Sequence, residues 1–287
     1  MTDLVLGYSS EFLPIRVILP DFEDGRLVRS LQYIHFTVLQ DPQRRLPAVT
    51  GVNIDGAMLR DIERGEHWHL DTRISASEQA GPEIYANNDL DRGHQVRRRD
   101  PVWGDLATAT AANQATFVYT NCAPQAGEFN QSAELWGGLE NHVLDYAQVY
   151  KQKISVFTGP VLADDDPPYR GIQIPRLFWK IAAWAEEHED GSFHLAAAGF
   201  VLDQTPELDD IDLRKAQADL AGNSPPLGPF KTYQVSIRDI EALTNLGLAD
   251  LMVADQFGFV LSTRDAAPRD TWQELRSLDD IRLNKPA

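Results

Sequence analysis

A short charged segment holds the side chains that acid–base chemistry at a phosphate would need. It reads Asn88-Asp-Leu-Asp-Arg-Gly-His94, so a histidine follows an arginine and a glycine, with acidic residues just before them. An imidazole near its usual pKa of ~6.5 can accept a proton from water at neutral pH. A guanidinium matches two phosphate oxygens at once. The segment predicts that His94 deprotonates water beside a phosphate bound by Arg92, although an ordinary charged turn can have the same composition.

Further short motifs follow this histidine along the chain. In order they are Arg97-Arg-Arg99, Thr116-Phe-Val-Tyr-Thr-Asn-Cys-Ala-Pro-Gln125, Phe129-Asn-Gln131 and Trp136-Gly-Gly-Leu-Glu140. The series resembles the DNA/RNA non-specific endonucleases, the endonuclease G-like branch of the ββα-metal (His-Me finger) nucleases with the Asp-Arg-Gly-His signature. Asn53-Ile-Asp-Gly56 and Phe157-Thr-Gly-Pro160 extend the resemblance to roughly residues 30 to 260. Several ordered motifs are more specific than any one of them.

The resemblance implies a reaction and assigns roles to two further groups. His94 would be the general base, and Asn130 would be the protein ligand to Mg²⁺, with Mn²⁺ or another divalent ion as alternatives. Magnesium prefers oxygen ligands and keeps several waters, so one amide oxygen can place it. The metal would stabilise the leaving oxygen and supply a water to protonate it. The implied function is a sugar-non-specific endonuclease that leaves 5′-phosphate and 3′-hydroxyl ends on DNA and RNA.

A second phosphate-binding arginine is expected upstream of the signature. Family members have an arginine a few residues before an aromatic residue and an aspartate. The segment Arg64-Gly-Glu-His-Trp-His-Leu-Asp71 fits this pattern, and Arg73 is the alternative. A surface ion pair is the other role open to either arginine.

The supporting residues of the metal site are less well defined by the sequence. By resemblance, Asn121 and Glu140 hold metal-bound water or position the metal ligand. Glu140 lies two residues further from Asn130 than in the best-known secreted members, and an unbroken helix would place the two side chains on different faces. Either the helix begins after Asn130 or contains an irregular turn, or Glu134 takes the role. Asp91 is expected to orient the loop or the histidine through hydrogen bonds.

The net charge of −17 argues against binding to nucleic acid, since affinity for phosphates comes largely from Lys and Arg. The local field in a cleft matters more than the total charge. No acid lies between Arg92 and Arg99, and Arg97, Arg98 and Arg99 are the candidate substrate-binding residues. We expect a basic seam on an acidic body, with weaker and more salt-sensitive binding than in a basic nuclease. The acid is concentrated in Asp164-Asp-Asp166, Glu186-Glu-His-Glu-Asp190 and Glu207-Leu-Asp-Asp-Ile-Asp212.

Three other groups could suggest different chemistry. The single cysteine, Cys122, excludes an internal disulfide and is compatible with a reducing compartment. We expect it to be a small core residue at the end of a strand rather than a nucleophile. His67 and His69 lack further ligands at zinc-like spacing. The acidic run Asp164-Asp-Asp166 lacks the spaced ligands of a calcium loop. We therefore expect half-exposed histidines and a solvated acidic turn.

The elements that must position these residues indicate an α+β fold. Leu31–Val38, Ala48–Ile54, Thr116–Thr120, Ile154–Phe157, Leu177–Trp184 and Phe193–Leu202 read as strands, and Asp41–Arg45, Asp164–Pro168 and Gly222–Pro226 as turns or loops. Helices are expected to begin at Asp100 and continue over Ala107–Ala112, and to span residues 131–152 and Ile237–Leu246. We predict one domain with a central antiparallel sheet, flanking helices and a ββα-metal motif.

The chain is expected to comprise an N-terminal extension (1–30) packed on the domain, an endonuclease domain (31–262) and a polar C-terminal tail (263–287) that is loosely held. It has no apolar run near the ~18 residues of a membrane span. Met1-Thr-Asp-Leu-Val lacks the start of a secretory signal, so a cytoplasmic location is expected, with export by another route left open. DNA and RNA are the expected partners, without a membrane, and the resemblance allows a homodimer.

Two other functions fit the same residues. The fold could serve as a catalytically weak module that binds nucleic acid or protein, although base, metal ligand and arginine are all present. The low basic charge also permits a phosphodiesterase that acts on small substrates. Cleavage of plasmid DNA would separate the endonuclease from both.

Overall fold

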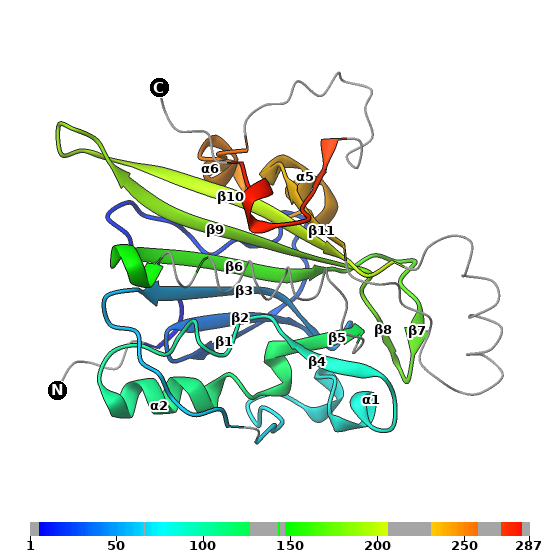
Figure 1. Cartoon of the computed structure of the whole chain (residues 1–287). Coiled ribbons are helices and arrows are strands. Elements are labelled where there is room, and N and C mark those ends of the chain that lie inside the picture. Colours follow the sequence, from blue (N-terminus) through cyan, green and yellow to red (C-terminus); the bar gives the residue numbers. More distant parts are fainter. Residues whose placement is uncertain are drawn as a thin grey trace.

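The computed structural model describes residues 6–65, 67–126, 143, 147–205, 231–257 and 271–282. In these residues an eight-stranded antiparallel sheet runs through the middle of the molecule (Figure 1). Its strands, in spatial order, are β1 (Arg29–Tyr33), β2 (Phe36–Asp41), β3 (Leu46–Asp55), β6 (Lys153–Val161), β9 (Leu177–Glu187), β10 (Phe193–Asp203), β11 (Lys231–Val235) and β12 (Gln273–Glu274). With its helices this is the single α+β domain that the sequence predicts.

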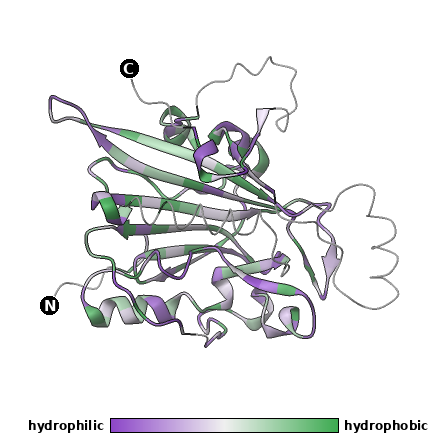
Figure 2. Ribbon diagram, in the orientation of Figure 1, coloured by the Kyte–Doolittle hydropathy of each residue, from purple (hydrophilic) through white to green (hydrophobic). Residues whose placement is uncertain are grey.

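The sheet is buried on both faces because its strands alternate side chains between two hydrophobic cores. Val52 and Val156 face one core, while Val49 and Phe157 face the other. Hydrophobic residues follow the central strands, and the turn at the tip of the β9–β10 hairpin is hydrophilic (Figure 2). Against the first core pack α1 (Pro82–Tyr85), η2 (Tyr119–Asn121) and a small hairpin of β4 (Leu90–His94) and β5 (Cys122–Ala126); against the second pack the segment before β1, α5 (Ile237–Thr244) and α6 (Ala249–Val253).

The first predicted strand, 31–38, is wrong in one respect, since it comprises two strands. β1 and β2 are joined by a tight turn in which His35 has φ +67°. The ring of His35 stacks on Trp103 at 3.4 Å, and its Nδ1 lies 2.8 Å from the Pro101 carbonyl. These distant contacts compensate for a left-handed conformation that is unusual outside Gly and Asn, so no local signal marks the turn.

The strand predicted over Thr116–Thr120 is also wrong. Residues 119–121 form the short helix η2, and only Val118 makes an isolated parallel bridge, to His69. The strand starts instead at Cys122 and includes Pro124, which cannot donate to a ladder but tolerates the edge of a two-stranded sheet. β4 and β5 thus supply the two strands of the expected ββα motif, with His94 opposite Cys122.

The helix predicted to begin at Asp100 begins later. Gly104 has φ +97°, which interrupts the helix, and α2 (Leu106–Ala115) follows with Asp105 as its N-cap. α5 agrees with the helix expected at 237–246, and β6, β9 and β10 agree with the later predicted strands. The helix predicted over 131–152 lies mostly outside the described residues, of which 147–150 are helical. The loop expected at 222–226 also lies outside them.

Residues 271–282, the described part of the predicted C-terminal tail, are tied to the sheet. β12 pairs with β11, and Leu275 is buried. The short helix η5 (Leu278–Asp280) follows. β7 (Pro168–Tyr169) and β8 (Ile172–Gln173) form a separate small hairpin, and η1 (Ala76–Glu78) precedes α1. Among the described helices, none combines the length and apolar character needed to cross a membrane.

Candidate active site

His94 is the last residue of β4 and lies against aromatic side chains. Its ring centroid is 4.7 Å from that of Trp68 and 5.3 Å from that of Phe117, which meets it edge-on. The Nε2 atom is buried and has no hydrogen-bond partner among the described residues. The imidazole is therefore held by packing, and no other described residue occupies this nitrogen.

The environment of His94 disfavours its protonated form. Burial, followed by the positive charges of Arg64 and Arg98, lowers the pKa of His94 to about 3. The ordinary pKa of ~6.5 expected from the sequence is therefore wrong for the free protein. The ring is neutral at physiological pH, which is the form that can accept a proton.

Arg92 shares the His94 side of β4. Side chains two residues apart in a strand point to the same face, and the guanidinium of Arg92 lies 5.6 Å from the centroid of Trp68 and 5.7 Å from that of Tyr85. The Asp91 side chain points to the opposite face. Asp91 is exposed and makes no hydrogen bond to His94 in the described part of the chain, so the structure gives no support to its orienting the ring.

Of the two upstream arginines, Arg64 lies near the histidine. It is exposed and close enough to lower the pKa of both His94 and Arg98. Arg73 is engaged elsewhere: its Nε donates to both carboxylate oxygens of buried Asp71, at 3.0 and 3.1 Å, and its guanidinium covers the Tyr33 ring at 4.5 Å. The structure thus favours Arg64 and gives Arg73 an architectural role.

The three consecutive arginines follow β4 in a turn. Arg98 is anchored, because its Nη1 donates to the Ile62 carbonyl at 2.9 Å and to Asn113 Oδ1 at 3.0 Å. Burial and the charges of Arg64, Arg99 and Arg97 lower the pKa of Arg98. These four residues form the arginine cluster. The like charges lie close together, which favours binding of an anion.

Asn121 is fully buried and clamps the chain that follows His94. Its Oδ1 accepts from the Val96 N–H at 2.8 Å, and its Nδ2 donates to the carbonyls of Val96 and Thr116 at 3.0 and 3.1 Å. Both amide hydrogens are used. Asn121 therefore holds this part of the backbone in place, and its predicted role in holding metal-bound water or positioning the metal ligand stays a prediction.

The predicted metal ligand lies outside the described residues, as do both candidates for its support, Glu140 and Glu134. In the described part of the chain, no three His, Cys, Asp or Glu side chains are grouped so that they could hold a metal. The predicted protein ligand, the amide oxygen of Asn130, is of the kind that Mg²⁺ prefers. The described residues supply the base and the arginines, and Asn130 stays a prediction.

The competing groups have structural roles. Cys122 is buried at the start of β5, not at the end of a strand, and burial raises the pKa of its thiol to about 12, which excludes an activated nucleophile. His67 and His69 are exposed on either side of Trp68. Asp166 is buried and pairs with Arg44 at 2.7 Å, so part of the acidic turn is internal rather than solvated.

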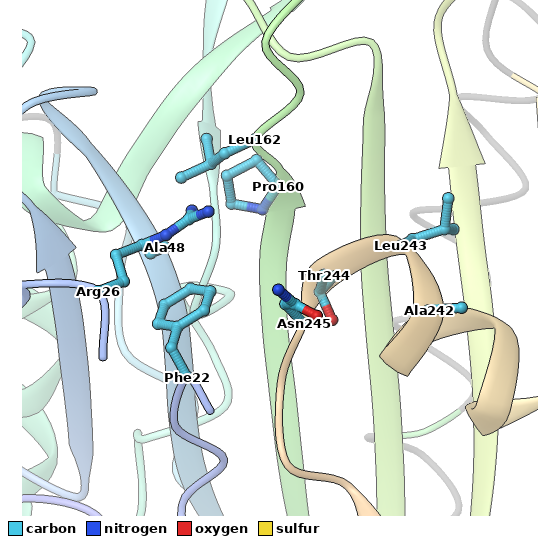
Figure 3. A pocket seen from close by; sticks show the side chains of 9 residues that line it. All are labelled: Phe22, Arg26, Ala48, Pro160, Leu162, Ala242, Leu243, Thr244 and Asn245. Carbon is cyan, nitrogen blue, oxygen red and sulfur yellow. The ribbon is translucent and has the colours of Figure 1, made fainter. Parts of the chain in front are cut away.

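A pocket of about 240 Å³ lies away from these residues (Figure 3). It contains one charged side chain, Arg26, whose guanidinium covers the ring of Phe22 at 4.5 Å. The other lining residues come from the ends of β3, β6 and α5, and none is a predicted site residue: Ala48, Pro160, Leu162, Ala242, Leu243, Thr244 and Asn245.

Trp68 is the site residue that sequence reasoning missed. Its segment is pinned beside the histidine by two backbone hydrogen bonds, from His69 N–H to the Phe117 carbonyl and from Tyr119 N–H to the His69 carbonyl. The available signal was the aromatic position between Arg64 and Asp71. This position distinguishes Arg64 from Arg73 but does not by itself assign a role to the tryptophan.

A neutral histidine beside several arginines on an α+β fold is the arrangement that the resemblance found in the sequence predicts. The DNA/RNA non-specific endonuclease family model matches residues 20–255. The chain belongs to this family, which confirms the resemblance found in the sequence.

Two relatives and one solved structure are similar to the chain. Protein y4fB of Sinorhizobium fredii (strain NBRC 101917 / NGR234) is 35% identical over 301 residues, covering 96% of this chain and 42% of y4fB. A nuclease of Nostoc sp. (strain PCC 7120 / SAG 25.82 / UTEX 2576) is 24% identical over 193 residues, covering 67% and 62%. The chain thus spans less than two thirds of either relative. A chain from a crystal structure of the EndoG/EndoGI complex shares the fold, with TM-score 0.55, 20% identity, and coverage of 78% of this chain and 86% of that one.

Proposed function

We propose that this chain is a metal-dependent endonuclease that hydrolyses phosphodiester bonds in DNA and RNA. The observation that carries the proposal is the buried Nε2 of neutral His94, which has no hydrogen-bond partner in the described part of the chain and lies beside arginines that can bind a phosphate. Family membership supports the same reaction. An isolated buried imidazole nitrogen is unfavourable for folding alone, but it is suited to accept a proton from a bound water.

In the proposed reaction, His94 Nε2 accepts a proton while the water oxygen forms a bond to phosphorus. The P–O3′ bond breaks, so that the phosphate stays on the 5′ carbon of the downstream nucleotide and the upstream one ends in a 3′-hydroxyl. Arg92 and Arg64 bind the non-bridging oxygens and stabilise their charge. Asn121 and Trp68 keep the end of β4 and the imidazole in place.

Asn130 is the proposed ligand of Mg²⁺, with Glu140 or Glu134 supporting its water ligands. When bound, the ion supplies charge stabilisation at the leaving oxygen and a water that can protonate it. Mn²⁺ fits the same oxygen donors. The metal-binding role of Asn130 can be tested separately from the base, by titrating Mn²⁺ into wild type and Asn130→Ala and following the paramagnetic signal of the free ion.

The test of the function is cleavage of supercoiled plasmid and of RNA, with Mg²⁺ and with excess chelator, by wild type, His94→Ala and His188→Ala. His188 is exposed on the turn after β9 and serves as the matched control. Loss of a general base predicts a rate about 10²- to 10⁴-fold lower in His94→Ala, with His188→Ala unchanged. The product ends should accept ligation without further phosphorylation.

Activity that survives both the chelator and His94→Ala would disprove the proposal. Hydrolysis of a chromogenic phosphodiester without cleavage of plasmid would favour the small-substrate enzyme instead. DNA binding with no cleavage in any divalent ion would favour the binding module.

A further inference from the structure

Trp68 lies between the two groups on which the proposed reaction depends. Its ring centroid is 4.7 Å from that of His94 and 5.6 Å from the guanidinium carbon of Arg92. Phe117 also packs against the His94 ring, but it is buried in the core and makes no cation–π contact with Arg92 among the described residues. Among the described residues, Trp68 therefore joins the proposed base to the proposed phosphate ligand.

No hydrogen bond to the His94 ring is present within the described residues to fix its orientation. Catalytic histidines are commonly oriented by a hydrogen bond at the nitrogen that does not react. Here the orientation depends on aromatic packing, with Trp68 tilted by 50° and Phe117 nearly perpendicular. Such aromatic contacts are each worth about 0.5–1.5 kcal/mol beyond their buried area, which suffices to favour one ring position.

Arg92 also lies against the tryptophan, and the Tyr119 side chain makes a hydrogen bond with the arginine. Arg92 is exposed, and in the described residues its guanidinium lies over the rings of Trp68 and Tyr85. A guanidinium over an aromatic face keeps its N–H groups directed outward in its own plane, where they can bind phosphate oxygens. The tryptophan can thus restrict the arginine without occupying its donors.

We propose that Trp68 is a positioning residue that holds the imidazole of His94 and the guanidinium of Arg92 in one fixed arrangement for phosphodiester hydrolysis. The inference rests on the proposed function. It assigns Trp68 a role in the rate of the reaction rather than in the affinity for nucleic acid. The backbone hydrogen bonds of His69 to the 117–119 segment make the tryptophan part of a rigid support.

The test measures kcat and KM on a fluorophore–quencher DNA oligonucleotide for Trp68→Leu, Trp68→Phe and Trp103→Phe. Misplacement of reacting groups predicts that Trp68→Leu lowers kcat about 10- to 100-fold, with KM changed by less than about threefold. Trp68→Phe keeps an aromatic face and should retain most of kcat. Trp103 is the matched control, because it also stacks on a histidine, His35, but belongs to the fold.

A double-mutant cycle separates positioning from a general loss of structure. If Trp68 acts in part through His94, Trp68→Leu should lower the residual rate of His94→Ala by a smaller factor than it lowers the wild-type rate, because coupled residues are not additive. An equal loss in both backgrounds would overturn the proposal. So would a rise in KM with kcat unchanged, which would make Trp68 a substrate-binding residue.

A spectroscopic measurement keeps the proposal testable independently of activity. In protein with ¹³C-labelled histidine, the ring resonances of His94 are assigned by their absence in His94→Ala. We expect them to move in Trp68→Leu and to stay in place in Trp103→Phe. Unmoved resonances would contradict the proposal, whereas wild-type activity in His94→Ala would contradict the proposed function and leave this measurement intact.

Discussion

The proposed base, His94, is a weak one in the free protein. Burial and two neighbouring guanidinium groups lower the pKa of His94 to about 3. A base of low pKa is always in its accepting form but has a small affinity for the proton. A phosphodiester anion bound beside Arg64 and Arg98 would offset their charges and raise the proton affinity of the ring. The substrate itself would then strengthen the base that acts on it.

The acid limb of the pH profile should reflect this lowered pKa. Because kcat/KM reports the free enzyme, we expect it to stay flat as the pH falls from about 8 to about 6, through the ordinary imidazole pKa of ~6.5. Replacing Arg64 by Gln removes a positive charge that disfavours the imidazolium, so the pKa should rise and the acid limb should move to higher pH.

The measurement is kcat/KM against pH for wild type, Arg64→Gln and Arg16→Gln. Arg16 is exposed and pairs only with exposed Glu11 among the described residues, so its replacement should leave the limb in place. The position of the limb is independent of any loss of rate in Arg64→Gln. A midpoint near 6.5 in wild type, or a limb that does not move in Arg64→Gln, would contradict the assignment.

At the residue scale, the sequence predicts the groups that are proposed to react and misses those that are proposed to hold them. His94 and Arg92 are recognisable because their side chains can perform the chemistry in any context. The choice of Arg64 over Arg73 depends on the hydrogen bonds of Arg73 to Asp71, which a sequence does not display. Trp68 has no reactive group, and its role follows only from its distances to two residues that come later in the chain.

At the scale of elements, one motif shared with the family proves to be architectural. Asn53 is buried in β3, where its Oδ1 accepts from the Ser9 N–H at 2.7 Å and ties the N-terminal segment to the sheet. Gly56, just past β3, donates its N–H to the Gln152 carbonyl at 2.9 Å. The two residues join β3 to the segments before β1 and before β6, and neither approaches His94 in the described contacts.

Gly56 should not tolerate a side chain. A Cβ at this position would lie 1.9 Å from the Ala147 carbonyl oxygen and 2.8 Å from that of Gln152. Both are backbone atoms and cannot rotate away, so the chains would have to separate. We expect Gly56→Ala to reduce the free energy of unfolding by about 1–3 kcal/mol, as other overpacked sites do.

Urea unfolding followed by circular dichroism measures this change. Gly247→Ala is the control, because the nearest atom to its Cβ is the flexible carboxylate end of Glu23 at 3.3 Å. There the reduced entropy of the unfolded chain should balance any contact, with a change below about 1 kcal/mol. Equal stability of the two variants would show that β3 and residue 147 separate easily.

The elements that the sequence predicts are those whose pattern is local. β6, β9 and β10 are long apolar or β-rich runs, and α5 has a Ser236 N-cap and an amphipathic face. The turn at His35 and the strand at Cys122 are different. The first depends on Trp103, and the second on pairing with β4, which lies 28 residues earlier. Tertiary contacts decide such segments, and propensity does not.

At the scale of the whole molecule, the charge is divided between regions. The arginine cluster follows β4, while the acidic run at 186–190 lies at the tip of the β9–β10 hairpin, at the far end of the sheet from β4 and β5 in Figure 1. A total of −17 therefore does not describe the field at the site. The separation of this one acidic run from the arginine cluster supports the predicted basic seam, which stays a prediction. The homodimer, the cytoplasmic location and the domain bounds stay predictions.

Substrate binding at a basic site should weaken as salt rises, even on an acidic protein. Each phosphate contact releases counterions from the nucleic acid, which salt opposes, while the same salt screens the long-range repulsion from the acidic body. We expect log KM to rise linearly with log[NaCl] between about 50 and 200 mM. Arg99→Ala should lower that slope by about 1 if Arg99 contacts one phosphate. Arg16→Ala, on the opposite face of the sheet, should leave the slope unchanged. Steady-state rates at fixed Mg²⁺ provide the measurement, and a slope that is equal in wild type and Arg99→Ala would remove Arg99 from the substrate-binding surface.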